Sequence, residues 1–227
     1  MVDLIWLAIA FPLLGVLING LVGKKLGRAW NGLIGAGSVG GAFVVGALVF
    51  LQVPALPHQA QSVPLWNWMT VGDFQVSASL LVDPLSMLMT LVVTGVGLLI
   101  HIYAIGYMEH DEGVSRFFTY LNLFIASMLI LVLSDNFLGL YMGWELVGLC
   151  SYLLIGFWFF KPEAADAGKK AFIVNRVGDV GFAVGVFLIW TTFGTLQYAA
   201  VFDMAPAVPA ATVAAITALL FVGAIGK

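Results

Sequence analysis

The chain has 227 residues, of which 62% are hydrophobic and 9% are charged, with a formal net charge of −3 and a mean hydropathy of +1.06. Soluble domains carry about one quarter charged residues, so the composition excludes an ordinary water-soluble globule and predicts a protein whose surface faces lipid. The single cysteine, Cys150, excludes an internal disulfide and a cysteine-based metal site, and no basic run indicates a nucleic-acid partner.

A helix that rises about 1.5 Å per residue needs about 20 apolar residues to cross about 30 Å of hydrocarbon. By this criterion the sequence predicts an all-α fold, a polytopic bundle of six complete transmembrane helices and part of a seventh. The predicted spans lie near Leu4 to Val22, Trp30 to Gln52, Pro84 to Tyr107, Phe117 to Leu133, Phe137 to Phe160, Ala171 to Phe193, and from Ala211 onward. The start of the chain, Met1 to Ala10, has no basic residue and carries Asp3, so we expect a retained helix and not a cleaved signal peptide.

The long connection between the second and third spans differs from the others. The alternation from Trp66 to Val71, followed by Gly72, predicts a short β-hairpin at the membrane interface. At the end of this connection, Asp83 and Pro84 predict a helix start, because aspartate is a favoured N-cap and proline fits the first helical position.

Basic residues in the connections alternate along the chain. They occur in the first, third and fifth connections, as Lys24, Lys25, Arg28, Arg116, Lys161, Lys169 and Lys170. The positive-inside rule then predicts that these connections face the cytoplasm and that the N-terminus lies outside. Arg176 and Lys227 are the remaining basic residues, and neither lies in a connection.

Two patterns that resemble cofactor sites are excluded by their context. Residues 35–40 fit the G-x-G-x-x-G dinucleotide pattern, but they lie inside the second span and lack the preceding strand that such a site needs. We interpret them, with the small residues from Gly37 to Gly41, as helix-packing positions. His58, His101 and His110 show no metal-ligand spacing, so no metal site and no cofactor-binding residue is predicted.

Glu145, Arg176 and Asp179 interrupt the fifth and sixth spans. Ionisable side chains near the middle of a membrane cost about 2.5 to 3.5 kcal/mol each on insertion scales, so they are rare without a partner or a water-filled cavity. Glu145 lies 8 residues into its span and Asp179 8 residues into the next from the opposite side, which places both about 12 Å deep. The sequence therefore predicts two carboxylates near the midplane.

The residues themselves leave more than one interpretation open. Arg176 and Asp179 are i and i+3 on one helix and could neutralise each other, whereas Glu145 must find a base on another helix or bind a proton. The charges could only hold helices together, or they could handle protons, because desolvation raises a carboxyl pKa and a nearby cation lowers it again. Lys227, taken alone, fits an anchor that extends to the interface.

Three stretches of sequence resemble the antiporter-like subunits of respiratory complex I. Residues 143–158, GWELVGLCSYLLIGFW, look like the signature of the fifth helix of that family, and residues 169–179, KKAFIVNRVGD, look like that of the sixth. Residues 116–124, RFFTYLNLF, together with Asp135 and Asn136, are similar to the region of the fourth helix. The likeness covers nearly the whole chain and is strongest to the L type, the distal and largest of these subunits.

The resemblance implies a fold of two inverted five-helix repeats in a longer chain, with a broken seventh helix. Residues 1–110 are then expected to hold three helices and an external hairpin near residues 53–83, and residues 111–227 the next four helices, with the second repeat missing. It also implies that Lys227, in the Gly-x-x-Gly-Lys motif of residues 223–227, is a central lysine that pairs with Glu145.

The implied function is proton translocation outward across the bacterial inner membrane, with Glu145, Asp179, Arg176 and Lys227 as the translocating groups. NADH oxidation and quinone reduction would occur in other subunits, which would hold the FMN and iron–sulfur clusters, so no cofactor is expected in this chain. The expected partners are the other membrane subunits, above all a neighbouring antiporter-like subunit, and the lipid bilayer. The alternatives are the large subunit of a multisubunit sodium/proton antiporter, a membrane-bound hydrogenase subunit, and a structural scaffold.

Overall fold

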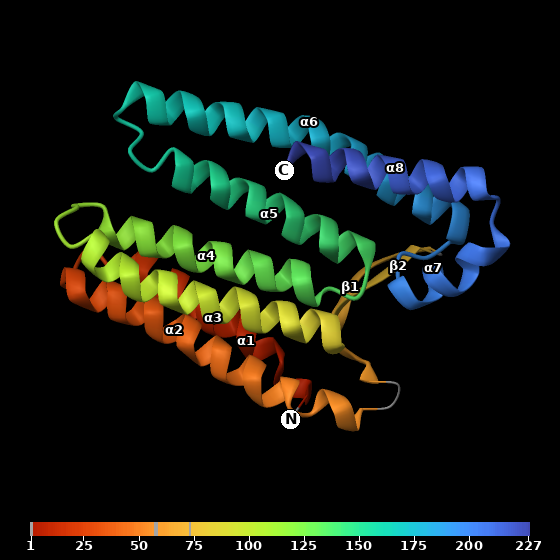
Figure 1. Cartoon of the computed structure of the whole chain (residues 1–227), viewed down its shortest axis with the longest axis horizontal. Helices are drawn as coiled ribbons and strands as arrows, with labels where there is room; N and C mark the ends of the chain where they lie inside the picture. The colour runs from red at the N-terminus through yellow and green to blue at the C-terminus, as the bar shows by residue number, and fades with distance from the viewer. Residues whose placement is uncertain (1, 57–58, 73) are drawn as a thin grey trace. The chain divides into compact units, whose positions relative to one another are not determined.

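The computed structural model describes residues 2–56, 59–72 and 74–227, so His58 and Asp73 lie outside the described residues. Helices dominate this part of the chain (Figure 1). The α-helices are α1 Trp6–Leu21, α2 Arg28–Phe50, α3 Pro84–Tyr107, α4 Val114–Leu133, α5 Phe137–Ile155, α6 Pro162–Phe193, α7 Tyr198–Met204 and α8 Ala210–Gly226. Six of them are long and apolar enough to cross a membrane, and α8 is a shorter apolar helix. The predicted polytopic helical fold is confirmed.

The chain divides into two compact units. Unit 1 is Met1–Val63 with Leu80–Leu133, and unit 2 is Pro64–Ser79 with Ser134–Lys227. Helix α4 belongs to unit 1, where it packs against α1, α2 and α3. The division of the helices thus falls after residue 133, whereas the sequence-based division was placed after residue 110.

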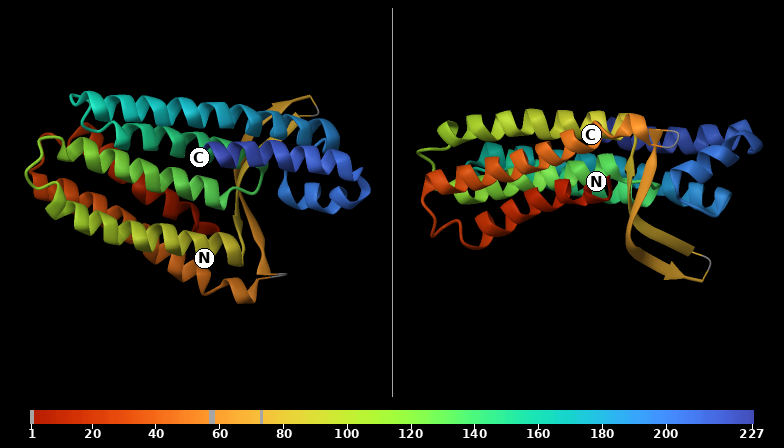
Figure 2. Two further views of the ribbon diagram at one scale, coloured as in Figure 1. Left: turned by 45° about the horizontal axis from the view of Figure 1, so that its top comes forward. Right: turned by 90° about the horizontal axis from the view of Figure 1, so that it is seen from below.

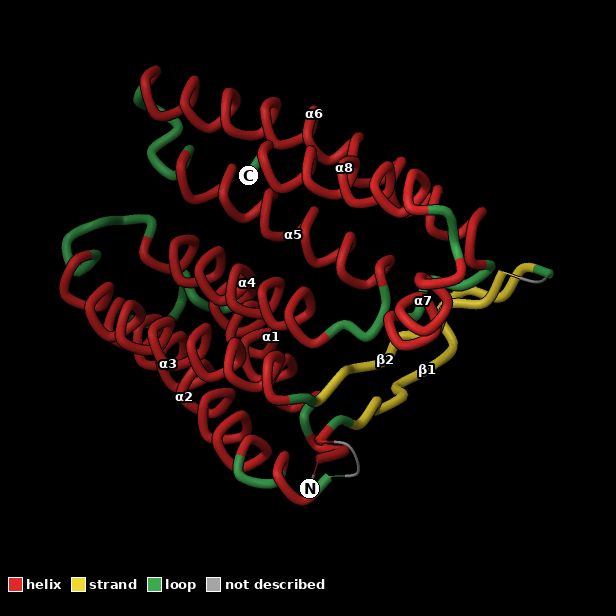
Figure 3. The backbone as a smooth tube through the Cα atoms, turned by 45° about the vertical axis from the view of Figure 1, so that its right-hand side comes forward, coloured by secondary structure: helices red, strands yellow, loops and turns green. Residues whose placement is uncertain are grey.

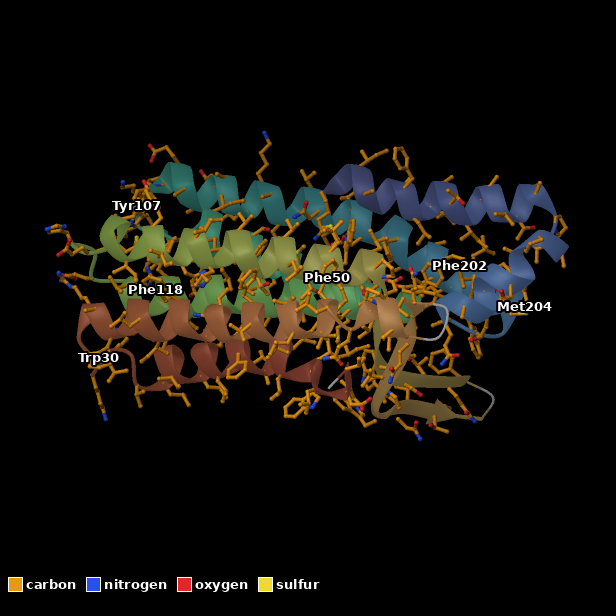
Figure 4. All side chains as sticks on the ribbon, turned by 60° about the horizontal axis from the view of Figure 1, so that its bottom comes forward. Trp30, Phe50, Tyr107, Phe118, Phe202 and Met204 are labelled. Atoms are coloured by element: carbon orange, nitrogen blue, oxygen red, sulfur yellow. The ribbon has the colours of Figure 1, made fainter. Side chains whose placement is uncertain are left out.

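Small residues allow the helices of unit 1 to approach closely. A Cβ atom at Gly35 would lie 2.7 Å from the ring of Phe118, and one at Gly41 would lie 3.2 Å from that of Phe11. Gly37 is different, because nothing lies within 4 Å of its Cβ position. The packing interpretation of this glycine-rich stretch therefore holds for Gly35 and Gly41 and not for Gly37. Phe118 is buried, whereas Trp30 and Tyr107 are exposed at the same end of the unit (Figure 4).

The predicted hairpin and helix start are both present. Strands β1 Gln61–Val71 and β2 Phe74–Val82 pair side by side (Figure 3), which makes the hairpin longer than the sequence predicted. Asp83 accepts a hydrogen bond from the backbone N–H of Ser86, and the Ser86 hydroxyl is 3.0 Å from the backbone nitrogen of Asp83. This capping box fixes the start of α3 because it satisfies two backbone donors that the first helical turn leaves open.

Two helix boundaries in unit 2 differ from the predicted ones, and one helix was not predicted. Helix α5 ends at Ile155 and not at Phe160, with Gly156 as its C-cap. Helix α6 begins at Pro162, nine residues before the predicted Ala171, and α7 lies in what was predicted as a plain connection. Hydropathy locates the part of a helix that crosses lipid, and α6 continues beyond that part through alanines and charged residues that favour helix.

Residues 134–136, which follow α4, join the hairpin to α5 within unit 2. The Ser79 hydroxyl donates to Asp135 at 2.5 Å, and the Asn136 amide donates to the Ser77 carbonyl at 3.1 Å. Asn136 also caps α5 by accepting from the Gly139 N–H. Nearby, burial and the Asp135 carboxylate raise the pKa of Tyr198 above its ordinary value. These contacts fix the N-terminal end of α5, at Phe137.

Candidate functional site

Helices α5, α6 and α8 of unit 2 bring the four predicted site residues together. Helices α6 and α8 lie side by side (Figure 2) and pack through glycines. A Cβ atom at Gly178 would lie 2.9 Å from the Cα atom of Gly226, so the two backbones nearly touch. This approach is possible because neither residue has a side chain. It places Lys227 beside the turn of α6 that carries Asp179.

Glu145 forms an ion pair with Arg176. A guanidinium nitrogen of Arg176, on α6, binds Oε2 of Glu145, on α5. Of the two possibilities that the sequence left open for Glu145, a base on another helix or a bound proton, the structure has the first. Its second oxygen, Oε1, is buried and has no hydrogen-bond partner among the described residues. Glu145 thus keeps one carboxylate oxygen available for a proton or a further donor.

Asp179 binds a different group from the one considered in the sequence. It is 1% exposed and faces the interior of the protein. Its Oδ1 atom accepts a hydrogen bond of 2.9 Å from the indole Nε1–H of Trp144. No ion pair joins Asp179 to Arg176 in the described part of the chain, because the Arg176 side chain extends across to α5 instead. The structure therefore does not form the pair within α6 that the sequence left open.

Lys227 also contacts Trp144. Its Nζ atom donates to the Trp144 backbone carbonyl at 2.9 Å and lies 5.4 Å from the centre of the indole ring. An ammonium within about 6 Å of an aromatic ring centre is attracted to the ring face. Among the described residues Lys227 forms no ion pair with Glu145, and its ammonium points at α5 and not along α8 to the interface. This arrangement differs from both interpretations given to Lys227 in the sequence.

Trp144 is the residue that sequence reasoning missed. Its N–H binds Asp179, its carbonyl and ring face bind the Lys227 ammonium, and its ring packs 5.2 Å from that of Phe182. Its place directly before Glu145, within the signature of residues 143–158, was the signal that could have identified it. One carboxylate and one cation therefore bind Trp144, while the Glu145–Arg176 ion pair begins at the next residue of α5.

The described histidines lie outside this site. His101 is buried in unit 1, where its Nδ1 is 2.7 Å from the Gly97 carbonyl oxygen. His110 lies in the exposed connection after α3. No group of three metal-binding side chains occurs within residues 2–56, 59–72 and 74–227.

Two family profiles match the chain. The profile described as "NADH-Ubiquinone oxidoreductase (complex I), chain 5 N-terminus" matches residues 68–118. The profile described as "NADH:quinone oxidoreductase/Mrp antiporter, TM" matches residues 134–227, a range that includes all four predicted site residues.

Individual relatives agree with these profiles. The chain is 49% identical over 224 residues to NADH-quinone oxidoreductase subunit L of Mycobacterium tuberculosis, which covers 98% of this chain and 35% of the relative. It is 47% identical over 205 residues to subunit L of Escherichia coli. That alignment covers 90% of this chain and 33% of the relative. A chain of the Mrp complex from Dietzia sp. DQ12-45-1b superposes with a TM-score of 0.81 at 26% identity. The superposition covers 98% of this chain and 23% of that one. The chain spans about a third of the length of its curated relatives.

Proposed function

Because the chain belongs to the family of subunit L, or chain 5, of NADH–quinone oxidoreductase, we propose that it forms part of a proton path through the membrane arm of such an enzyme. The complete enzyme would couple this path to electron transfer from NADH to quinone. Proton translocation, and not electron transfer, is the part of the reaction that we assign to this chain.

One observation carries the proposal: four ionisable residues lie on three apolar helices, where Glu145 binds Arg176 and where Asp179 and Lys227 both bind Trp144. Four ionisable groups in the membrane interior are costly, and a purely structural role needs only matched pairs. Here Asp179 binds a neutral donor, and Lys227 a neutral acceptor. Groups that are charged and not matched with an opposite charge can change protonation state at moderate free energy, which a proton path requires.

We assign the following roles. Glu145 is the proton-accepting carboxylate, and it is paired with Arg176. Lys227 is the mobile cation, which loads or releases a proton according to whether it lies near a carboxylate. Asp179 is the second carboxylate, and it binds the indole N–H of Trp144. In the structure Glu145 and Lys227 are not paired, so the proposed Glu145–Lys227 switch is in its open arrangement.

The remaining assignments concern the whole enzyme. We place the chain in the bacterial inner membrane as a multi-pass subunit that contacts other membrane subunits, with an antiporter-like subunit as its neighbour. FMN, iron–sulfur clusters and quinone belong to other subunits of the proposed enzyme.

The test uses the full-length protein in its native membrane. Affinity capture is expected to recover iron–sulfur proteins with it, and NADH is expected to acidify the interior of inverted membrane vesicles. A sodium/proton antiporter subunit, the alternative favoured by the likeness to an Mrp complex chain, would instead exchange protons for sodium without NADH. Capture without iron–sulfur proteins, together with sodium-driven exchange, would replace our proposal by that alternative.

The orientation is a separate prediction. Lys24, Arg116 and Lys169 are expected to face the cytoplasm, and Trp66 and Asp203 the outside, because basic residues are retained on the cytoplasmic side. Single cysteines introduced at these positions, in a chain with Cys150 replaced, would be labelled by a membrane-impermeant maleimide in whole cells and in inverted vesicles. Labelling of position 116 from outside would contradict the model of the topology.

A further inference from the structure

We propose that Trp144 and Gly148 form a docking cradle for the Lys227 ammonium, which holds it away from Glu145 while Arg176 occupies that carboxylate. The inference rests on the proposed proton path and adds a step to it. In this step Arg176 and Lys227 compete for the Glu145 carboxylate. The cradle stabilises the arrangement in which Arg176 binds that carboxylate.

The first argument is that Trp144 binds the ammonium in two ways and is itself held in place by Asp179. The Trp144 carbonyl accepts from Nζ at 2.9 Å, and the indole ring centre lies 5.4 Å from the same atom. A carbonyl oxygen has two lone pairs, so it can accept from lysine while it remains part of the helix. The indole N–H, on the other edge of the ring, is fixed by Asp179 at 2.9 Å, which orients the ring face.

The second argument concerns Gly148, one turn after Trp144 on α5. A Cβ atom at this position would lie 2.6 Å from Nζ of Lys227. The absence of a side chain therefore makes the space that the ammonium occupies. The next nearest atom, Nδ2 of Asn175, is 3.9 Å away, so the ammonium is the one group that an added methyl would displace.

The third argument is that a nearby alternative exists for the displaced ammonium. Glu145 directly follows Trp144, and its Oε1 atom is buried without a hydrogen-bond partner among the described residues. Oε2 is held by Arg176. A lysine side chain has four rotatable carbon–carbon bonds and can reorient its ammonium without moving the helix backbone. The cradle and the Glu145 carboxylate are thus two binding positions for one mobile charge.

The decisive variant is Gly148→Ala in the complete, assembled enzyme. The added methyl meets the end of a flexible side chain and not backbone, so the fold should tolerate it. It should move the ammonium from the cradle to Glu145, with a change of about tenfold in the ratio of the two positions, as expected for a lost hydrogen bond to a charged group. Gly37→Ala is the matched control, because its added methyl meets nothing within 4 Å.

Two measurements read out the result. High-resolution electron microscopy of the assembled enzyme should place Nζ near Glu145 in Gly148→Ala and near the Trp144 carbonyl in Gly37→Ala. NADH-driven proton pumping should fall in the first variant only. Trp144→Phe, which keeps the carbonyl and a ring face but loses the N–H bound to Asp179, should shift the pH profile of pumping, which a purely structural role would leave in place.

The cradle fails as an explanation if Nζ stays at the Trp144 carbonyl in Gly148→Ala, or if Gly148→Ala and Gly37→Ala pump equally. This outcome differs from failure of the proposed function. If Glu145→Gln and Lys227→Ala both pump normally, the proton path itself is wrong. If those two lose pumping while Gly148→Ala does not, only the cradle is overturned.

Discussion

Glu145→Gln is expected to reduce NADH-driven proton pumping at least about tenfold in the assembled enzyme. Opposite charges about 4 Å apart interact by about 4 kcal/mol at an effective dielectric near 20, and about 1.4 kcal/mol is a factor of ten. The amide keeps the shape of the side chain, but it cannot take up a proton and leaves Arg176 without its counter-charge. The rate of NADH oxidation should fall only to the extent that electron transfer is coupled to proton pumping.

The comparison for Glu145→Gln is Glu163→Gln, which makes the same chemical change at an exposed position in the first turn of α6. Pumping would be followed by a pH-sensitive dye in inverted vesicles, and assembly by recovery of the other subunits. Glu145→Asp should regain part of the activity, because it restores an ionisable group with a shorter reach. Equal pumping by Glu145→Gln and Glu163→Gln in assembled enzyme would assign the Glu145–Arg176 pair a structural role alone.

Lys227→Ala is expected to have an effect of similar size. It removes the mobile cation and leaves the Trp144 carbonyl and ring without the ammonium that they bind. The control is Lys170→Ala, at an exposed lysine of α6. Lys227→Arg should assemble but pump poorly, because a guanidinium stays charged at all relevant pH values and is too broad for the space at Gly148.

Pumping by Lys227→Arg at the parental rate would argue that the positive charge at residue 227, and not its loss and gain of a proton, is what the path needs. Measurement across a range of pH separates these cases. A group that releases its proton during turnover gives a pH-dependent rate, whereas a fixed charge does not.

The long apolar helices could be predicted from the sequence because insertion into lipid depends mainly on local composition. Helix α3 begins and ends as predicted, at Pro84 and Tyr107, since its start also has a capping signal that can be seen in the sequence. The start of α6 could not be predicted in this way. Its first turns leave the apolar segment, and hydropathy then carries no information on whether the backbone remains helical.

The sequence identified residues of the candidate site, but it did not predict which of them bind one another. The cost of charge in lipid identified Glu145, Arg176 and Asp179 one by one. The choice of Glu145 over Asp179 as the partner of Arg176 depends on how α5 and α6 approach each other, and sequence spacing on one helix is silent on that. For the same reason Trp144 and Gly148 passed as ordinary apolar positions, although both contact Lys227.

Helix α6 has a length that matters beyond the site. Its 32 residues correspond to about 48 Å, whereas the hydrocarbon of a bilayer is about 30 Å thick. The helix must therefore tilt, or about three of its turns must stand in the aqueous layer. Its first turns carry Glu163, Asp166, Lys169 and Lys170. The turn that bears Arg176 and Asp179 is continuous with this polar end. Because the helix is continuous between them, a displacement of the polar end along the helix axis would also displace both of these residues.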